Sequence, residues 1–384
     1  MLGNDAPAGG FLVYRERGHE ASNVATWLHD AGYRTALIGK YLNDYEKDPA
    51  HVPPGWDRWF AYAGKGKYDN YCINDQGVLR DYGKGRDRKD PNQYQTDVLA
   101  REAVAFVEDA PPEQPLFLYL APAAPHEPAI PAPRHENAPV ARAGAPRPPS
   151  FNEPDMADKP RWASQPPLTG EDVAGIDAYY VDQLRTMLAV EETIDAAIDA
   201  LERTGRGKNT YLFFTSDNGY HHGEHRIAED KQTPFEEAIR VPLVVIGPGV
   251  PAGTATDALT SNIDLAPTIA DLAGLETPSF VDGRSLTPLL GGDVPTVWRD
   301  AVLSELLSSE DDAFVVLRTG PYAYVAFDSG AREMYDVVQD PYQLENFYGD
   351  ALKGLIADLE TRLDALAECG AEKSELCQDV DGGS

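Results

Sequence analysis

The chain has 384 residues, 42% of them hydrophobic, which is enough to bury one large core, or one core with a smaller attached subdomain. Its 63 acidic and 33 basic residues give a formal net charge of -30, so its overall field excludes nucleic acid as a general partner. Adaptation to high salt is another explanation of the acidity. No run of about 18 apolar residues occurs, so we expect no membrane-spanning helix.

Apolar runs of strand length recur along the first 250 residues. The runs at 34–39, 115–121, 210–216 and 241–247 predict fully buried strands. Amphipathic stretches separate them. This alternation predicts an α/β fold, with a mainly parallel central sheet and helices on both faces.

Local signals set the expected helix boundaries. Residues 22–32 predict a helix that ends at Gly32, because glycine readily adopts the left-handed conformation found after a helix. A second helix is expected over residues 96–110, with Thr96 as its N-cap. The longest helix is expected over residues 175–205.

The pattern changes twice further along the chain. A proline-dense stretch at 121–170 interrupts the alternation, and long loops in compact domains are often functional. We expect the loop at 127–170, together with a C-terminal subdomain, to line the substrate cleft. Beyond it, antiparallel strands are expected around a turn at 319–321, followed by a closing helix. We therefore predict an α/β domain over 1–292 and a small C-terminal α+β subdomain over 293–384.

Polar side chains follow three of the predicted strands. Lys40 follows the first, His126 lies in the loop after the second, and Asp217 and Asn218 follow the third. Ligands of open α/β sheets bind at these carboxyl ends. Carboxylate and amide oxygens suit a hard cation, Ca²⁺ or Mg²⁺. An Asp-Asn-Gly turn is the alternative, and the strand-end context favours the metal.

Lys231 completes the candidate set. Two lysines and a histidine near a cation would form a pocket for a compact oxyanion and would offset charge on a transferring sulfuryl or phosphoryl group. Considered one at a time, Lys40 is typical of a solvated lysine at a strand end, His126 of a loop histidine and Lys231 of a surface charge. The three histidines between positions 221 and 225 lack the spacing of a helical zinc pair, and we expect them to shape the loop.

These residues resemble the type I sulfatases of the alkaline phosphatase-like superfamily. The resemblance covers nearly the whole chain, in this order: "WLHDAGYRTALIGKYLNDY", "FFTSDNGYHHGEHRIAEDKQTPFEEAIRVPLVVIGPGV", "SNIDLAPTIADLAGL", "DGRSLTPLL" and "MYDVVQDPYQLEN". Its "GKYLN" form is most similar to arylsulfatases and N-acetylglucosamine-6-sulfatases.

The resemblance implies a role for each candidate. Asp217 and Asn218 would ligate a divalent cation, commonly calcium. Lys40, His126 and Lys231 would contact a sulfate ester, with the last two closest to the leaving-group oxygen. The family's nucleophile is a formylglycine made from the Cys or Ser of a Cys/Ser-x-Pro-x-Arg motif. The expected partner is a small-molecule or glycan sulfate ester.

The chain departs from the family pattern at the nucleophile. Cys72, Cys369 and Cys377 lie outside any such motif, no Ser-x-Pro-x-Arg occurs, and the family's upstream aspartate pair has no counterpart. We therefore expect an N-terminal truncation with little or no activity of its own. A signal peptide lost with it would place the protein in the periplasm or outside the cell; otherwise it is cytoplasmic. A local bridge between Cys369 and Cys377 would leave Cys72 unpaired.

Two other functions stay open. A phosphodiesterase or phosphonate hydrolase on the same fold would use a similar pocket, although the amide of Asn218 favours one hard metal over the two-metal phosphatase arrangement. A degenerate member would bind sulfated glycans without turnover. The sequence does not predict the oligomeric state or the particular ester.

Overall fold

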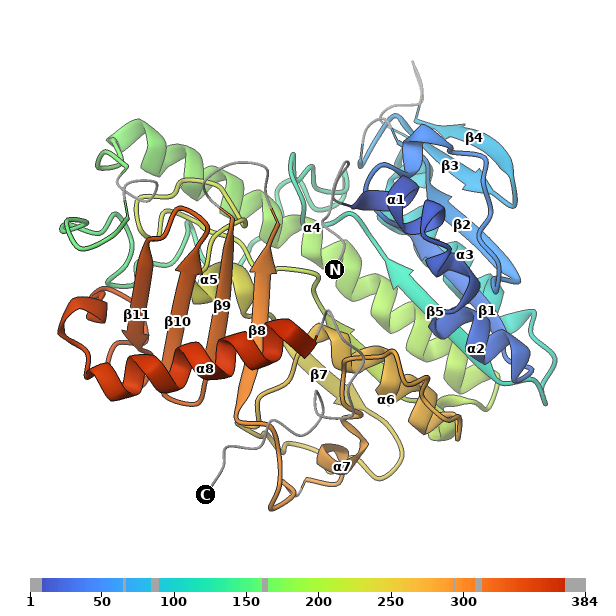
Figure 1. Cartoon of the computed structure of the whole chain (residues 1–384). Helices are drawn as coiled ribbons and strands as arrows, with labels where there is room; N and C mark the ends of the chain where they lie inside the picture. The colour runs from blue at the N-terminus through green and yellow to red at the C-terminus, as the bar shows by residue number, and fades with distance from the viewer. Residues whose placement is uncertain are drawn as a thin grey trace. The chain divides into compact units, whose positions relative to one another are not determined.

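The computed structural model describes residues 9–64, 67–83, 90–160, 165–292, 294–307 and 313–369 (Figure 1). Two units hold most of the contacts within the chain. The N-terminal unit comprises residues 2–145 and 177–210, and the C-terminal unit comprises residues 146–176 and 211–384. The predicted subdomain boundary near 293 lies inside the C-terminal unit and stays a prediction.

A five-stranded sheet organises the N-terminal unit. Its order is β4-β3-β2-β1-β5. The strands are β1 (Arg34–Gly39), β2 (Arg58–Tyr62), β3 (Tyr71–Asp75), β4 (Val78–Tyr82) and β5 (Leu116–Ala121). β1 runs parallel to both β2 and β5, whereas β3 and β4 continue the sheet in antiparallel pairing. The α/β fold with a parallel centre is therefore confirmed.

Helices cover both faces of this sheet. Neighbouring side chains of β1 point to opposite faces, and each packs against a different set of helices. Ile38 packs in a core with Phe106 of α3 (Gln95–Glu108) and Ala200 of α4 (Gly170–Arg203). Leu37 packs in a second core with Phe11 of α1 (Gly10–Glu16). Both cores consist of fully or almost fully buried side chains, so the sheet is held from both sides.

Of the two predicted helix boundaries, the C-terminal glycine Gly32 is confirmed and the N-cap Thr96 is wrong. α2 (Val24–Asp30) is followed by Gly32 with φ +89°, and the amide of Gly32 donates to the carbonyl of His29, 2.9 Å away, which confirms the predicted C-terminal glycine. Thr96 is not the N-cap of α3. The N-cap is Tyr94, two residues earlier, and the amide of the first helical residue, Gln95, donates to the carbonyl of Tyr68, a contact that no local signal encodes.

In the C-terminal unit, β6 (Leu212–Thr215) and β7 (Leu243–Ile246) pair antiparallel in a two-stranded sheet. The prediction that these strands are fully buried is wrong: Val244 and Ile246 are 51% and 59% exposed. Alternate side chains of a strand point to opposite faces, and the face of β7 that carries Val244 and Ile246 is exposed. β5 departs in the same way, since Tyr119 is 52% exposed.

The predicted C-terminal antiparallel strands and closing helix are confirmed. β8 (Ala301–Leu306), β9 (Phe314–Thr319), β10 (Tyr322–Phe327) and β11 (Arg332–Asp336) form a sheet of order β11-β10-β9-β8. α8 (Lys353–Cys369) lies across one face of it (Figure 1), where Leu359 packs with Leu317 and Tyr324. The short helices α5 (Glu236–Ile239), α6 (Leu265–Leu272) and α7 (Thr287–Leu290) precede this sheet in the chain.

The remaining predictions concern segments without regular structure. Between the end of β5 at Ala121 and the start of α4 at Gly170, the described part of the proline-dense stretch contains no helix or strand beyond a bridge between Phe151 and Glu224. Cys72 is a buried cysteine of β3. Cys377, and with it the predicted bridge to Cys369, lies outside the described residues. No described helix is long and apolar enough to cross a bilayer.

Candidate active site

Lys40 emerges where two parallel strands end together. β1 and β5 pair in register up to Gly39 and Ala121, and the amide of Lys40 donates to the carbonyl of Ala121, 2.7 Å away. Gly39 has φ +122°, and a Cβ there would lie 2.0 Å from that carbonyl oxygen. Only glycine permits this close approach, so the backbone itself fixes where Lys40 leaves the sheet.

His126 lies in the loop that follows the neighbouring strand β5. Its amide donates to the carbonyl of Ala123, and its carbonyl accepts from the hydroxyl of the fully buried Tyr68. Its ring Nδ1 lies 2.8 Å from Nζ of Lys67. The structure thus places Lys40 and the loop of His126 at the carboxyl ends of two neighbouring parallel strands.

Asp217 and Asn218 follow β6 after one residue, Ser216. The amide of Asn218 donates to Oδ1 of Asp217 (3.1 Å), and its side-chain nitrogen donates to the carbonyl of Gly219 (2.8 Å). Because the nitrogen faces the main chain, the carbonyl oxygen of Asn218 is the atom that a cation would take. The side chain of Asn262 donates to the carbonyl of Ser216 and steadies the turn from outside.

The segment with Lys231 returns alongside this strand end. The amides of Gly219 and Tyr220 donate to the carbonyls of Ala238 and Glu237, both at 2.8 Å. A Cβ on Gly219 would lie 2.0 Å from the carbonyl oxygen of Glu237, so the two segments meet in backbone contact. The amide of His221 in turn donates to the carbonyl of Asp230, the residue before Lys231, at 2.8 Å. Asp217, Asn218 and Lys231 therefore belong to one local structure in the C-terminal unit, while Lys40 and His126 belong to the N-terminal unit.

His221 and His225, in the loop between Gly219 and Lys231, pack against neighbouring side chains of the same unit and so stabilise the loop. His221 is fully buried with Nε2 2.7 Å from Oγ1 of Thr233, and burial lowers its pKa to about 4, so it stays neutral. His225 stacks on Phe235 with 3.8 Å between ring centroids. Burial alone would lower the pKa of His225, but the adjacent carboxylates of Glu153 and Glu237 raise it.

A buried charged cluster that sequence reasoning missed supports this loop. Glu153 contacts Nδ1 of His225 at 2.7 Å and Nζ of Lys159 at 3.1 Å. Lys159 also donates to the carbonyl of Leu344. Glu333 of β11 is fully buried nearby, and burial raises the pKa of its carboxyl to about 7 despite the charge of Lys159. No local pattern links residues so far apart in the chain.

The two expected metal ligands fit part of a hard-cation site. They supply one carboxylate and one amide oxygen, whereas Ca²⁺ takes six to eight oxygen ligands. Over the described part of the chain, no group of three or more His, Cys, Asp or Glu side chains is arranged to hold a metal ion. Asp217 and Asn218 are thus suitable donors that need further ligands.

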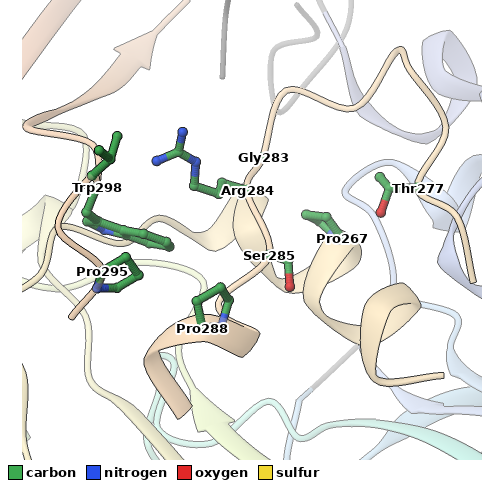
Figure 2. Close-up of a pocket in the computed structure, with 9 residues that line it drawn as sticks. Pro267, Thr277, Gly283, Arg284, Ser285, Pro288, Pro295 and Trp298 are labelled. Carbon is green, nitrogen blue, oxygen red and sulfur yellow. The ribbon is translucent and has the colours of Figure 1, made fainter. Parts of the chain in front are cut away.

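A separate hollow of about 390 Å³ lies in the C-terminal unit (Figure 2). The indole of Trp298 and the prolines Pro288 and Pro295 form much of its wall, and the guanidinium carbon of Arg284 lies 5.2 Å from the centre of the Trp298 ring. None of the predicted site residues lines it.

Two family models match the chain. The model described as "Sulfatase" matches residues 4–275, and the model described as "N-sulphoglucosamine sulphohydrolase, C-terminal" matches residues 223–369. Among curated relatives, the N-acetylglucosamine-6-sulfatase of Homo sapiens is 36% identical over 71% of this chain and 50% of its own length. The same enzyme of Capra hircus is 32% identical over 88% and 67%, and the arylsulfatase of Volvox carteri is 29% identical over 97% and 65%.

Solved structures agree with the fold. A protein in complex with its substrate D-glucosamine-2-N,6-O-disulfate is 26% identical, with a TM-score of 0.70 over 92% of this chain and 84% of that one. A 2-O GAG sulfatase is 19% identical, with a TM-score of 0.72 over 98% and 81%, which bears on the fold alone. The chain spans about half the length of its human relative. With one family model matching residues 4–275 and a second most of the remainder, the chain belongs to the sulfatase family.

Proposed function

We propose that the protein is a sulfuric ester hydrolase that cleaves a sulfate ester at a divalent-metal site. The observation that carries the proposal is the position of the expected residues at strand ends in a chain of this family. Lys40 directly follows β1, and Asp217 and Asn218 follow β6 after a single residue. Ligands of α/β sheets bind at such ends.

Each residue has a chemical role in this proposal. Lys40 pairs its ammonium with the sulfate oxygens, and His126 and Lys231 act on the leaving-group oxygen, where negative charge develops as the ester bond breaks. Asp217 and Asn218 hold Ca²⁺ or Mg²⁺ together with ligands from elsewhere. When bound, the cation withdraws charge from the sulfate oxygens.

The nucleophile is not assigned to any residue of the printed sequence. The family's formylglycine derives from a Cys/Ser-x-Pro-x-Arg motif, which this sequence lacks. We therefore propose that the chain by itself turns over little or no ester, and that turnover depends on a segment that supplies this motif.

A sulfated sugar is the substrate class that we propose. The relatives with the highest identity named above are N-acetylglucosamine-6-sulfatases, and the structure at 26% identity holds a disulfated glucosamine as its substrate. Aryl sulfates remain useful as reporter substrates, since an arylsulfatase also matches over 97% of this chain.

The decisive experiment begins with the coding DNA directly upstream, in frame. A segment encoding paired aspartates and Cys/Ser-x-Pro-x-Arg supports the enzyme. The protein expressed with that segment should hydrolyse an aryl sulfate and 6-O-sulfated N-acetylglucosamine. Lys231→Ala should lower the rate by about 10²-fold or more, as for loss of one charge-stabilising group, while the exposed Lys208→Ala should not. Sulfated-glycan binding without turnover would favour the degenerate binder instead, and an unchanged rate would remove Lys231 from the site.

A further inference from the structure

Lys67 is a second lysine at His126, and nothing in the sequence pattern singles it out. It lies between β2 and β3, and its Nζ is 2.8 Å from Nδ1 of His126. The next residue, Tyr68, is fully buried, and its hydroxyl donates to the carbonyl of His126. The carbonyl of Tyr68 in turn accepts from the amide of Gln95 at the start of α3. These hydrogen bonds of Tyr68 hold the backbone beside Lys67 in place relative to His126.

The chemistry of the two groups decides which ring nitrogen carries the proton. A lysine ammonium has three donors and no acceptor, so a hydrogen bond to Nδ1 requires a lone pair on that nitrogen. A neutral imidazole with a lone pair on Nδ1 carries its proton on Nε2. A doubly protonated ring has no lone pair and cannot accept from Lys67.

The backbone offers one competing arrangement. The carbonyl of Glu127 lies 3.2 Å from the same Nδ1 of His126, and it would accept from a protonated Nδ1. The contact with Lys67 is shorter, and a hydrogen bond from a charged donor is roughly twice as strong as one between neutral groups. The hydrogen bond from Lys67 to Nδ1 is therefore the stronger of the two.

We propose that Lys67 is a positioning residue that fixes His126 in the tautomer with its proton on Nε2. The inference rests on the proposed role of His126 at the leaving-group oxygen, toward which Nε2–H would donate. When that oxygen takes the Nε2 proton, the ammonium of Lys67 gives one proton to Nδ1. The imidazole thus stays neutral, the lysine becomes an amine, and the departing alkoxide becomes an alcohol.

The tautomer can be measured without any turnover, on the full chain with ¹⁵N-labelled histidine. Ring ¹⁵N shifts and couplings distinguish a protonated nitrogen from a bare one, and His126→Gln identifies the signals. Wild type should show Nε2 protonated and Nδ1 bare. Lys67→Met should move the proton wholly or partly to Nδ1, facing Glu127. Lys67→Arg, also only a donor, should keep the wild-type tautomer, and Lys208→Met, an exposed lysine of the same unit, should change nothing.

Two results would overturn the inference: a wild-type His126 protonated on Nδ1, or an unchanged tautomer in Lys67→Met. A cooperative thermal unfolding transition in each variant confirms that the comparison is between folded chains. Should Lys67→Met fail to fold, the wild-type measurement still decides, because a proton on Nδ1 contradicts the proposal directly.

A second arm links the tautomer to catalysis in a protein expressed with a segment that supplies the Cys/Ser-x-Pro-x-Arg motif. Lys67→Met should lower kcat by about 10²-fold, the scale of a lost proton donor, with a smaller change in KM. The loss should be larger for a sugar sulfate than for a nitrophenyl sulfate, whose leaving group needs no proton; equal losses would contradict the relay. If wild type shows the predicted tautomer but no turnover, the proposed function fails while the role of Lys67 as the group that sets the tautomer stands.

Discussion

Nδ1 of His225 lies 2.7 Å from Oε2 of Glu153, and neither side chain is more than 3% exposed. The two residues are 72 positions apart, in the loop after Asp217 and in the segment that precedes α4. Lys159, whose side chain has no exposure, contacts the other oxygen of the same carboxylate. One buried carboxylate thus ties the loop beyond the proposed metal ligands to the rest of its unit.

Replacing Glu153 with glutamine should destabilise the protein by about 3 kcal/mol, because the buried ammonium of Lys159 loses its closest carboxylate and keeps only that of Asp158, 3.5 Å away. Urea unfolding at pH 7 measures the change. Glu276→Gln, at an exposed position of the same unit, should stay within about 0.5 kcal/mol of wild type. Equal midpoints for the two variants would mean that the buried pair contributes nothing.

Glu333 should make the protein less stable as the pH rises from about 4.5 to about 7. Burial raises the pKa of its carboxyl from 4.5 to about 7 in the folded state. Between these values the folded state keeps a proton that the unfolded state has lost, so the free energy of unfolding falls with increasing pH and then levels off. The group accounts for about 3 kcal/mol, at about 1.4 kcal/mol per pKa unit.

Glu333→Gln tests this dependence because it keeps the shape of the side chain and removes the titration. Thermal or urea unfolding at pH 5 and pH 8 should show a smaller loss of stability for the variant than for wild type. The variant should also be the more stable of the two at pH 8. Identical slopes for both proteins would show that Glu333 is not the titrating group.

Calcium should stabilise the protein through Asp217. A site with a Kd tenfold below the added calcium raises the free energy of unfolding by about 1.4 kcal/mol. Thermal unfolding with and without calcium measures the shift, which Asp217→Ala should abolish. Asp257→Ala, at an exposed position, should keep it. A full calcium shift in Asp217→Ala would refute this residue as a ligand.

Gly219→Ala should separate the strand end from the segment that carries Lys231, since the new Cβ would lie 2.0 Å from the carbonyl oxygen of Glu237. We expect a loss of at least about 2 kcal/mol, together with a loss of calcium-dependent stabilisation. Gly175→Ala is the matched control, because a Cβ meets nothing within 4 Å there. In its helix, alanine should add up to about 1 kcal/mol. A Gly219→Ala protein as stable as wild type would contradict the close approach.

Local sequence predicted the elements whose signals are short in range. The strand that ends at Gly39, the helix end at Gly32 and the turn at 319–321 all lie where the sequence placed them, because apolar run length and turn-forming residues act over a few positions. The same reasoning placed Asp217 and Asn218 directly after a strand. Their part in a metal site stays a prediction.

The sequence by itself determined the family, the α/β class with a mainly parallel central sheet, and the positions of Lys40 and Asp217 at strand ends, since these follow from contiguous motifs and from the alternation of apolar runs with amphipathic stretches. Only the tertiary structure decided the antiparallel pairing of β6 with β7, the burial of Glu153 with His225, and the contact of Lys67 with His126. The last two join residues 72 and 59 positions apart. Such partners carry no local periodicity, and their meeting depends on how the whole chain packs.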